Sequence, residues 1–340
     1  MNNYFEKYKL PKLYIGSTIG IISPSCPITY DAPYPAEVAE DYLKSNGFKI
    51  VKGNLYGKID STYRSGSIKN RAEELNELIH NDEVDCIMAA AGGYVSISML
   101  PYIDYDYLKE HPKVIVGHSD ITSLLLAINE KCRFPTFYGP NLVTSFAHKK
   151  YYQDYALNSF LNIINHSESY TILKPEYYTD ESTDWYTTEK AFNKNLENEK
   201  AILNEWKTVV PGVAKGRLIG GNTDNFSLLY GNPYCSEVQD GDVLFLENIN
   251  EEADFFERAI SSLYMHGIFD KISGLILGKP KGYKDIGSGK SELDILFEIV
   301  VNPRFPVLAD VDCGHTVPII TLPIGAEIEM DADKKEITVL

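Results

Sequence analysis

The sequence is poor in the features that mark membrane and nucleic-acid-binding proteins. Its longest apolar runs, such as residues 124–128, are far shorter than the roughly 20 residues that a membrane-spanning helix needs. Lys and Arg number 32 against 48 Asp and Glu, and the formal net charge is -16. This charge argues against a nucleic acid polymer as the main partner, because phosphate backbones bind basic surfaces. The charge does not exclude a nucleotide-sized ligand, because such a ligand needs only a local site.

Cysteines are few, odd in number and scattered, and no two form a C-x-x-C pair. They are Cys26, Cys86, Cys132, Cys235 and Cys313. This usage predicts free thiols in a reducing compartment, and it favours neither a disulfide framework nor a zinc site. Residues 1–6 lack a basic region followed by an apolar one, so no secretory signal is predicted. We therefore expect a cytoplasmic protein.

Strand and helix patterns alternate in the first part of the chain. Short apolar runs predict strands at 19–23, 48–51, 84–90 and 114–116, and helical spacing predicts helices at 35–46, 68–79 and 121–129. Such alternation is typical of a parallel sheet that is covered by helices on both faces. We assign residues 1–165 to an N-terminal α/β domain.

The pattern changes in the middle of the chain and then resumes. Residues 166–210 are rich in tyrosine, glutamate, asparagine and lysine, and they suggest a connecting region with a few helices or a lid over a site. Beyond residue 211, strands are predicted at 243–246 and 274–278, helices at 253–265 and 293–301, and a hairpin at 326–340. Residues 211–340 are therefore assigned to a second, mixed α/β domain.

A serine stands where the strand 114–116 turns into the following helix. A turn of this kind lifts the Ser119 hydroxyl out of the sheet edge and places it beside backbone N–H groups that stabilise an oxyanion. The match to G-x-S-x-G is imperfect, because Asp120 and Ile121 replace its last two positions. An interpretation of Ser119 or Asp120 as a simple helix cap stays open.

Two glycines follow the strand 84–90. Gly92 and Gly93 allow the backbone to approach a ligand, and their N–H groups can point at a carbonyl oxygen. A tight turn with no further role is the alternative. The loop matches neither G-x-x-x-x-G-K nor G-x-G-x-x-G, so it is not predicted to bind phosphate.

A serine nucleophile needs a base, and seven histidines compete for that role. His315 stands apart from the others, because it lies in a turn of small residues, 312–316, directly after a strand-like segment. Glu247 closes the apolar strand 243–246. A carboxylate in that position either orients a histidine or forms half of an ion pair, and both interpretations stay open.

Three short motifs in this order resemble the serine-type LD-carboxypeptidases. They are Gly117–Asp120, Leu246–Asn248 and Cys313–His315. The closer likeness is to the microcin C immunity proteins, which are serine peptidases that inactivate a peptide-nucleotide antibiotic. The likeness covers nearly the whole chain, and further landmarks follow in the family's order at 21–25, 65–67, 89–94, 138–140, 220–222, 274–279 and 322–325.

The resemblance implies a fold and a site. The fold is α/β, with an N-terminal flavodoxin- or Rossmann-like three-layer sandwich, a smaller C-terminal mixed domain of the swivelling type, and the site between them, usually in a homodimer. The chemistry requires no metal and no cofactor. The implied residues are a catalytic triad of Ser119, Glu247 and His315, an oxyanion hole from the N–H groups of Gly93 and Asp120, and substrate contacts from Gly92, Tyr94, Trp185 and Asn222.

Four positions bear on the substrate. Ala91 replaces the arginine that murein carboxypeptidases carry before the glycine pair, and Trp185 resembles the aromatic that stacks on the nucleobase in the immunity proteins, although a packed hinge tryptophan is the alternative. Tyr94 stands where the family more usually has glycine or asparagine, and Lys281 stands where an acidic residue is expected.

We therefore expect hydrolysis of an amide bond near the C-terminus of a small peptide-like substrate, with a peptidyl- or aminoacyl-nucleotide favoured. Cleavage of murein tetrapeptides is the alternative, and a non-catalytic binding protein is the third interpretation.

Overall fold

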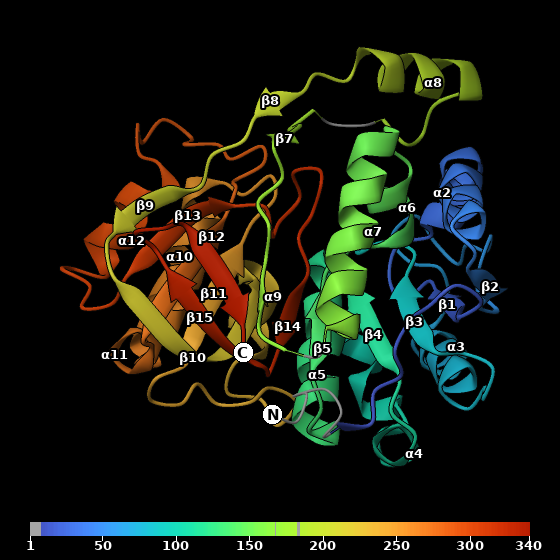
Figure 1. Ribbon diagram of the computed structural model, residues 1–340, viewed down its shortest axis with the longest axis horizontal. Coiled ribbons are helices and arrows are strands. Elements are labelled where there is room, and N and C mark those ends of the chain that lie inside the picture. The colour runs from blue at the N-terminus through green and yellow to red at the C-terminus, as the bar shows by residue number, and fades with distance from the viewer. Residues whose placement is uncertain (1–7, 167, 182–183) are drawn as a thin grey trace.

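The computed structural model describes residues 8–166, 168–181 and 184–340, and it contains two large sheets (Figure 1). The first sheet has six strands: β1 (Thr18–Ile22), β2 (Lys49–Lys52), β3 (Cys86–Ala89), β4 (Val114–Gly117), β5 (Thr136–Tyr138) and β14 (Leu322–Ile324). Their spatial order is β14-β5-β4-β3-β1-β2. The first five strands are parallel and follow the flavodoxin-like order 2-1-3-4-5.

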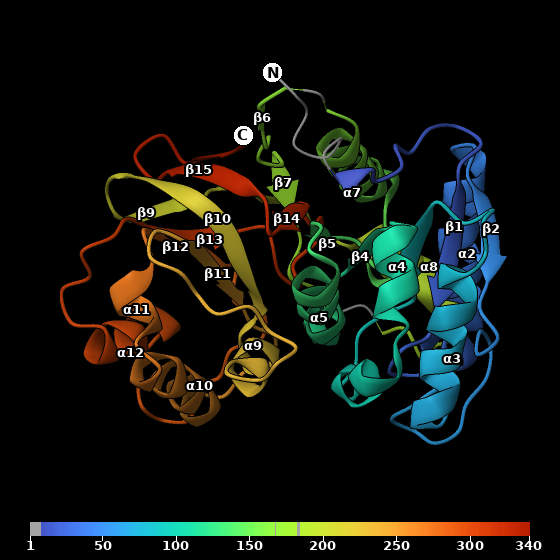
Figure 2. The ribbon, with the colours of Figure 1, turned by 90° about the horizontal axis from the view of Figure 1, so that it is seen from below.

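Helices cover both faces of this sheet (Figure 2). One group that packs together comprises α2 (Pro33–Ser45), α6 (Leu142–Phe146) and α7 (Lys150–Asn165). The other group comprises α3 (Ile68–Ile79), the 3-10 helix η2 (Ser96–Tyr102), α4 (Tyr105–Glu110) and α5 (Thr122–Cys132). A short helix α1 (Ile28–Asp31) precedes α2. The strands between the two groups are buried on both faces, which explains their continuous apolar runs.

The second sheet has eight strands with a parallel centre. Its order is β6 (Tyr170–Thr171), β16 (Glu336–Val339), β15 (Glu327–Asp331), β10 (Val213–Asn222), β11 (Val243–Glu247), β12 (Gly274–Gly278), β13 (Val307–Val311) and β9 (Lys207–Val210). Strands β10 to β13 are parallel, and the outer strands are antiparallel. The accompanying helices are α9 (Thr223–Leu229), α10 (Ala253–Met265), α11 (Ile268–Lys271) and α12 (Glu292–Ile299). The predicted two-domain α/β fold is confirmed.

The sheets cross the divisions drawn from the sequence. Strand β14 lies late in the chain, yet it pairs antiparallel with β5 and completes the first sheet. The connecting region adds β6 and β9 to opposite edges of the second sheet. Its described residues also contain a ribbon of β7 (Tyr177–Tyr178) and β8 (Ile202–Leu203), and one helix, α8 (Glu189–Asn198). The expectation of a few helices there was wrong, because strands of two residues are too short to show an alternating pattern.

No helix among the described residues is long and apolar enough to cross a membrane. The five cysteines are all unpaired.

Candidate active site

The carboxyl ends of the strands in both sheets carry the residues that the sequence singled out. In the first sheet, Gly92 follows β3 and Ser119 follows β4. In the second, Glu247 is the last residue of β11, and His315 follows β13. Ligands of open α/β sheets bind at these strand ends, so the topology alone selects this edge as the candidate site.

Ser119 lies in a strained turn between β4 and the short 3-10 helix η3 (Ser119–Ile121). Its φ angle is 66°, a left-handed conformation that non-glycine residues rarely adopt and that recurs at functional sites. Its backbone N–H donates a hydrogen bond to the Tyr138 hydroxyl at 2.9 Å. Neither η3 nor α5 has a side-chain N-cap, so the interpretation of Ser119 or Asp120 as a simple cap of this helix is wrong.

Asp120 connects the turn at Ser119 to the segment that follows Gly92 and Gly93. Its buried carboxylate accepts hydrogen bonds from the backbone N–H groups of Val95 at 3.1 Å and Ser96 at 2.9 Å, at the start of η2. Burial raises the pKa of Asp120, while these donors and the Ser25 hydroxyl oppose that shift. The Asp120 side chain thus anchors the segment after the glycines, and its own N–H group remains beside Ser119.

The glycine pair lies against the nucleophile turn. A Cβ atom on Gly92 would lie 3.0 Å from Ser119 Oγ and 3.3 Å from the Asp120 nitrogen. Gly93 has φ of 147°, which only glycine adopts readily, and a Cβ there would overlap Ser25. Across the described ranges, the N–H groups of Gly93 and Asp120 donate to no protein acceptor. Both donors are therefore available to a ligand.

We expect Gly92→Ala to lower kcat/KM by about 100-fold or more, because the new methyl group would occupy space beside the Ser119 hydroxyl. Displacing a reacting group by about 1 Å lowers the rate by about this factor. The backbone of Gly92 does not require a positive φ, so the variant should fold. Steady-state kinetics with a thermal unfolding curve checks this. Wild-type kcat/KM in a folded variant would show that the space beside Gly92 is not used.

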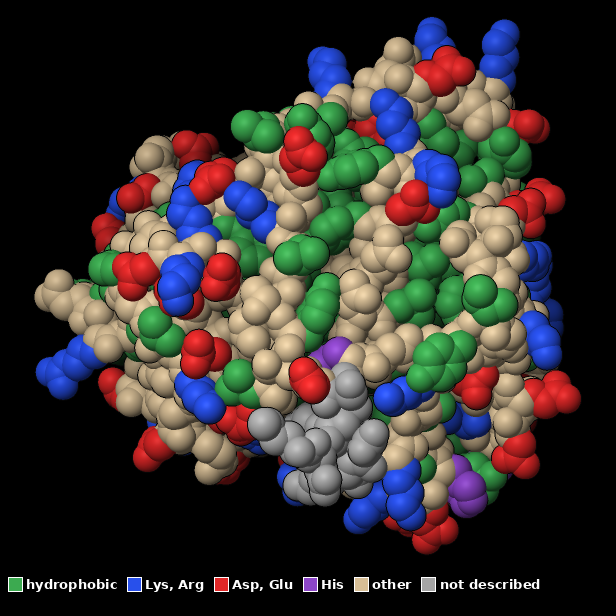
Figure 3. Space-filling model, in the orientation of Figure 1, with side chains coloured by type: hydrophobic (Ala, Val, Ile, Leu, Met, Phe, Trp, Pro, Cys, Tyr) green, Lys and Arg blue, Asp and Glu red, His purple; other side chains and the backbone are tan. Residues whose placement is uncertain are grey.

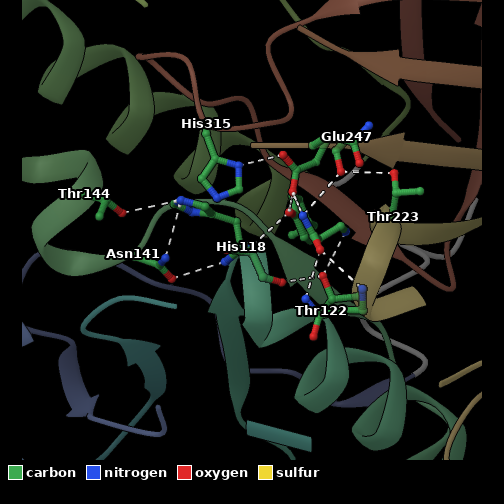
Figure 4. A network of polar contacts seen from close by, with 12 residues as sticks. His118, Thr122, Asn141, Thr144, Thr223, Glu247 and His315 are labelled. Atoms are coloured by element: carbon green, nitrogen blue, oxygen red, sulfur yellow. Dashed lines mark hydrogen bonds and ion pairs between the residues drawn. The ribbon is translucent and has the colours of Figure 1, made fainter. Parts of the chain in front are cut away.

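Glu247 and His315 form a buried pair at the end of the second sheet (Figure 4). His315 Nδ1 lies 2.7 Å from Glu247 Oε2. The other oxygen, Oε1, accepts hydrogen bonds from the Tyr138 hydroxyl at 2.5 Å and from Asn222 Nδ2 at 3.1 Å. Burial acts to raise the pKa of Glu247, but His315 and these donors outweigh it, and the pKa lies below its ordinary value. Glu247 is therefore an anion that orients the imidazole of His315 through Nδ1. Its charged partner is this histidine, and no lysine or arginine forms an ion pair with it among the described residues.

The Ser119 hydroxyl makes no hydrogen bond to His315 or to any other group within the residues that the structure describes. Catalytic hydrogen bonds of this kind are often long in ligand-free sites and tighten when substrate binds.

His118, next to Ser119, is buried and faces His315. Burial and the adjacent His315 lower the pKa of His118 to about 4, so it is neutral at pH 7. Its Nδ1 lies 2.9 Å from the Gly139 carbonyl, and its ring meets that of His315 edge to face at 5.3 Å. This packing supports the His315 ring without adding a charge next to it.

A pocket of about 220 Å³ opens beside His315. Trp185, Lys281 and His148 are among the residues that line it. Trp185 is half-buried, with its ring edge to face with His148 at 5.2 Å and tilted against Phe192 at 6.2 Å. Burial lowers the pKa of Lys281, whose ammonium group donates to the Glu181 carbonyl at 3.2 Å. The predicted tryptophan and the unexpected lysine therefore share one pocket with His315.

The remaining predicted contacts lie elsewhere. Asn222 caps α9 and holds Glu247, so it is placed to position the carboxylate and not to line the pocket. The Tyr94 side chain is 87% exposed and does not line the pocket either. Tyr138 and His148 were not predicted from the sequence, although Tyr138 stands in one of the family landmarks, at the end of a short strand. Within the described part of the chain, no group of three or more His, Cys, Asp or Glu side chains is arranged to hold a metal ion.

Family models match both halves of the chain. The model of the LD-carboxypeptidase N-terminal domain covers residues 19–139, and that of the LD-carboxypeptidase C-terminal domain covers residues 215–330. The chain belongs to the LD-carboxypeptidase family. It is therefore a hydrolase of the carboxypeptidase type. Of the candidate residues, Ser119 lies in the segment that matches the first family domain, and Glu247 and His315 lie in the segment that matches the second.

Relatives within the LD-carboxypeptidase family match along nearly their full length. The microcin C7 self-immunity protein MccF of Escherichia coli is 39% identical over 96% of this chain and 94% of its own. A probable murein peptide carboxypeptidase of Bacillus subtilis is 28% identical over 96% of this chain and 93% of its own. The structure of MccF in complex with glutamyl sulfamoyl guanosine superposes with a TM-score of 0.91 at 38% identity, covering 96% of this chain and 97% of MccF.

Proposed function

We propose that the protein is a serine peptidase that hydrolyses an amide bond near the C-terminus of a peptidyl- or aminoacyl-nucleotide, as a self-protection enzyme. The observation that carries this proposal is the Glu247–His315 pair at 2.7 Å, whose histidine lines a pocket together with His118, the residue before Ser119 in its strained turn. A serine that only caps a helix would need neither the left-handed φ angle of Ser119 nor the pairing of His315 with Glu247.

In the proposed reaction, the Ser119 hydroxyl attacks the substrate carbonyl carbon while His315 takes its proton. The imidazolium, stabilised by Glu247, then passes that proton to the leaving nitrogen as the C–N bond breaks. Water, deprotonated in turn by His315, hydrolyses the resulting ester and restores the serine. The free N–H groups of Gly93 and Asp120 are the proposed donors to the oxyanion.

The pocket favours a nucleotide as the leaving portion of the substrate. It extends from His315 to Trp185, whose half-buried ring offers a flat apolar surface. Solved structures of MccF contain aspartyl sulfamoyl adenosine and, in a variant that replaces a tryptophan by phenylalanine, adenosine monophosphate. A ligand of this class would place its amide at Ser119 and its base at Trp185.

We expect Trp185→Ala to raise KM for an aminoacyl sulfamoyl nucleoside by about tenfold or more with little change in kcat, because base stacking on an aromatic ring contributes about 1–3 kcal/mol. Trp185→Phe is the matched control and should lose less, because it keeps a ring. Equal losses on a substrate without a nucleobase would instead indicate that Trp185 only packs against Phe192 and His148.

The decisive experiment incubates the purified protein with an aminoacyl sulfamoyl adenosine and, separately, with a murein tetrapeptide, and follows the products by mass spectrometry with Ser119→Ala as control. Cleavage of the first supports the proposal. Cleavage of the tetrapeptide alone supports the alternative murein function, which the Bacillus subtilis relative favours. Cleavage of neither, with tight binding of one, would indicate a non-catalytic binding protein.

We also propose that the enzyme acts as a homodimer in the cytoplasm. The five unpaired thiols are consistent with a reducing compartment. Hydrophobic side chains gather on the face over α7, β7 and β8 (Figure 3), where Leu173 and Leu203 are exposed, and this face is a candidate for the dimer contact. Light scattering after size-exclusion chromatography measures the oligomeric state.

A further inference from the structure

Tyr138 connects the two halves of the site through one hydroxyl group. It is the last residue of β5 in the first sheet and is completely buried. Its oxygen accepts the Ser119 N–H at 2.9 Å and donates to Glu247 Oε1 at 2.5 Å. The nucleophile turn and the carboxylate, which are 128 residues apart and belong to different sheets, therefore share one hydrogen-bonding partner.

The direction of these bonds is fixed by chemistry. The Ser119 N–H is a donor only, and ionised Glu247 is an acceptor only, so the single phenolic proton must point at the carboxylate. Burial and the adjacent Glu247 charge raise the pKa of Tyr138 well above its ordinary value, which keeps that proton in place. The ring is held in turn by Phe245 on β11, edge to face at 5.2 Å.

Each bond has a separate consequence. The bond to Ser119 stabilises a left-handed backbone conformation that is unfavourable for a serine. It also engages the Ser119 N–H group and leaves oxyanion binding to other donors. The bond to Glu247 completes the set of partners around the carboxylate, because Asn222 contacts the same oxygen and His315 contacts the other.

We propose that Tyr138 is a positioning residue of the reaction. It holds the turn at Ser119 and the Glu247–His315 pair in fixed positions relative to each other across the boundary between the two sheets. The inference rests on the proposed function, because it requires Ser119 and His315 to act together. Tyr138 does not line the pocket and so does not act by touching substrate.

The test is Tyr138→Phe, which removes only the hydroxyl, compared with Tyr105→Phe, which removes a half-buried hydroxyl that donates to the Leu100 carbonyl away from the site. We expect Tyr138→Phe to lower kcat about 10- to 100-fold with KM within about twofold, since small misplacements of reacting groups have effects of this size. Tyr105→Phe should keep the wild-type kcat.

The pH profile separates positioning from general destabilisation. Without the tyrosine proton, Glu247 is a stronger base and holds the imidazole proton more tightly, so the acid limb of kcat/KM should move to higher pH in Tyr138→Phe and stay in place in Tyr105→Phe. A wild-type kcat, a loss equal to that of Tyr105→Phe, or an unshifted acid limb would overturn the proposal.

A second variant covers the case in which Tyr138→Phe does not fold. Site-specific 3-fluorotyrosine at position 138 keeps both hydrogen bonds but is a more acidic donor, so the acid limb should move to lower pH, and an unmoved limb would overturn the inference. Failure of the proposed function is distinguishable, because the wild-type enzyme would then not cleave the aminoacyl sulfamoyl adenosine. If the wild type is active and Ser119→Ala is inactive, the kcat values and pH profiles of the Tyr138 variants test the role of Tyr138 alone.

Discussion

Ser119→Ala should lower kcat by at least about 10⁴-fold, because removing the nucleophile of a serine triad leaves only binding and oxyanion contacts. The measurement is single-turnover hydrolysis of an aminoacyl sulfamoyl adenosine followed by mass spectrometry. The Ser119 hydroxyl makes no hydrogen bond among the described residues, so its loss removes no contact that stabilises the fold.

Two controls accompany this variant. Its thermal unfolding temperature should equal that of the wild type, and its dissociation constant for the substrate should change by less than a few-fold in calorimetry. Retained turnover in the folded, ligand-binding variant would exclude Ser119 as the nucleophile and with it the proposed triad.

Glu247→Gln should lower kcat by about 10⁴-fold, as expected when an amide replaces the carboxylate that fixes the histidine tautomer. The amide cannot stabilise an imidazolium, and its NH₂ group can face Nδ1, which then no longer carries the proton. The measurement is kcat at pH 7, with the unfolding temperature recorded in parallel.

Glu292→Gln is the matched control. Burial raises the pKa of Glu292 to about 8, so its carboxyl group is mostly protonated at pH 7, and glutamine is then a neutral isostere. We expect kcat within about threefold of the wild type for this variant. If the two glutamine variants lost activity equally, the effect of Glu247→Gln would not be specific to the carboxylate that contacts His315.

The parts of the fold that the sequence predicted are those with long local patterns. The helix at 253–265 and the strand at 274–278 have the predicted bounds, because each has a full apolar face or run and clear ends. The ten-residue strand β10 was not predicted from its pattern, since exposed and buried positions alternate only over its first three residues, and its last five are all buried and include Gly220 and Gly221. Strand β14 has three residues and depends on pairing with β5, a contact between distant segments that local patterns do not show.

The candidate site was predicted to a similar extent. Strand ends and the family resemblance located Ser119, Glu247 and His315, and the structure brings the last two into contact. Tyr138 was missed as a functional residue, because its role depends on two partners in distant segments and its own neighbourhood looks like an ordinary apolar strand. Asn222 was assigned to substrate for the same reason, since its bond to Glu247 follows from the pairing of β10 with β11.

The return of β14 to the first sheet also bears on how the protein is made. Ribosomes deliver the chain from its N-terminus, and many domains fold as soon as they emerge. Here the sheet that carries Ser119 lacks its edge strand until residues 322–324 are available, and His315 emerges only shortly before them. The proposed hydrolytic activity should therefore arise in one late step of biosynthesis, after His315 and β14 have been synthesised.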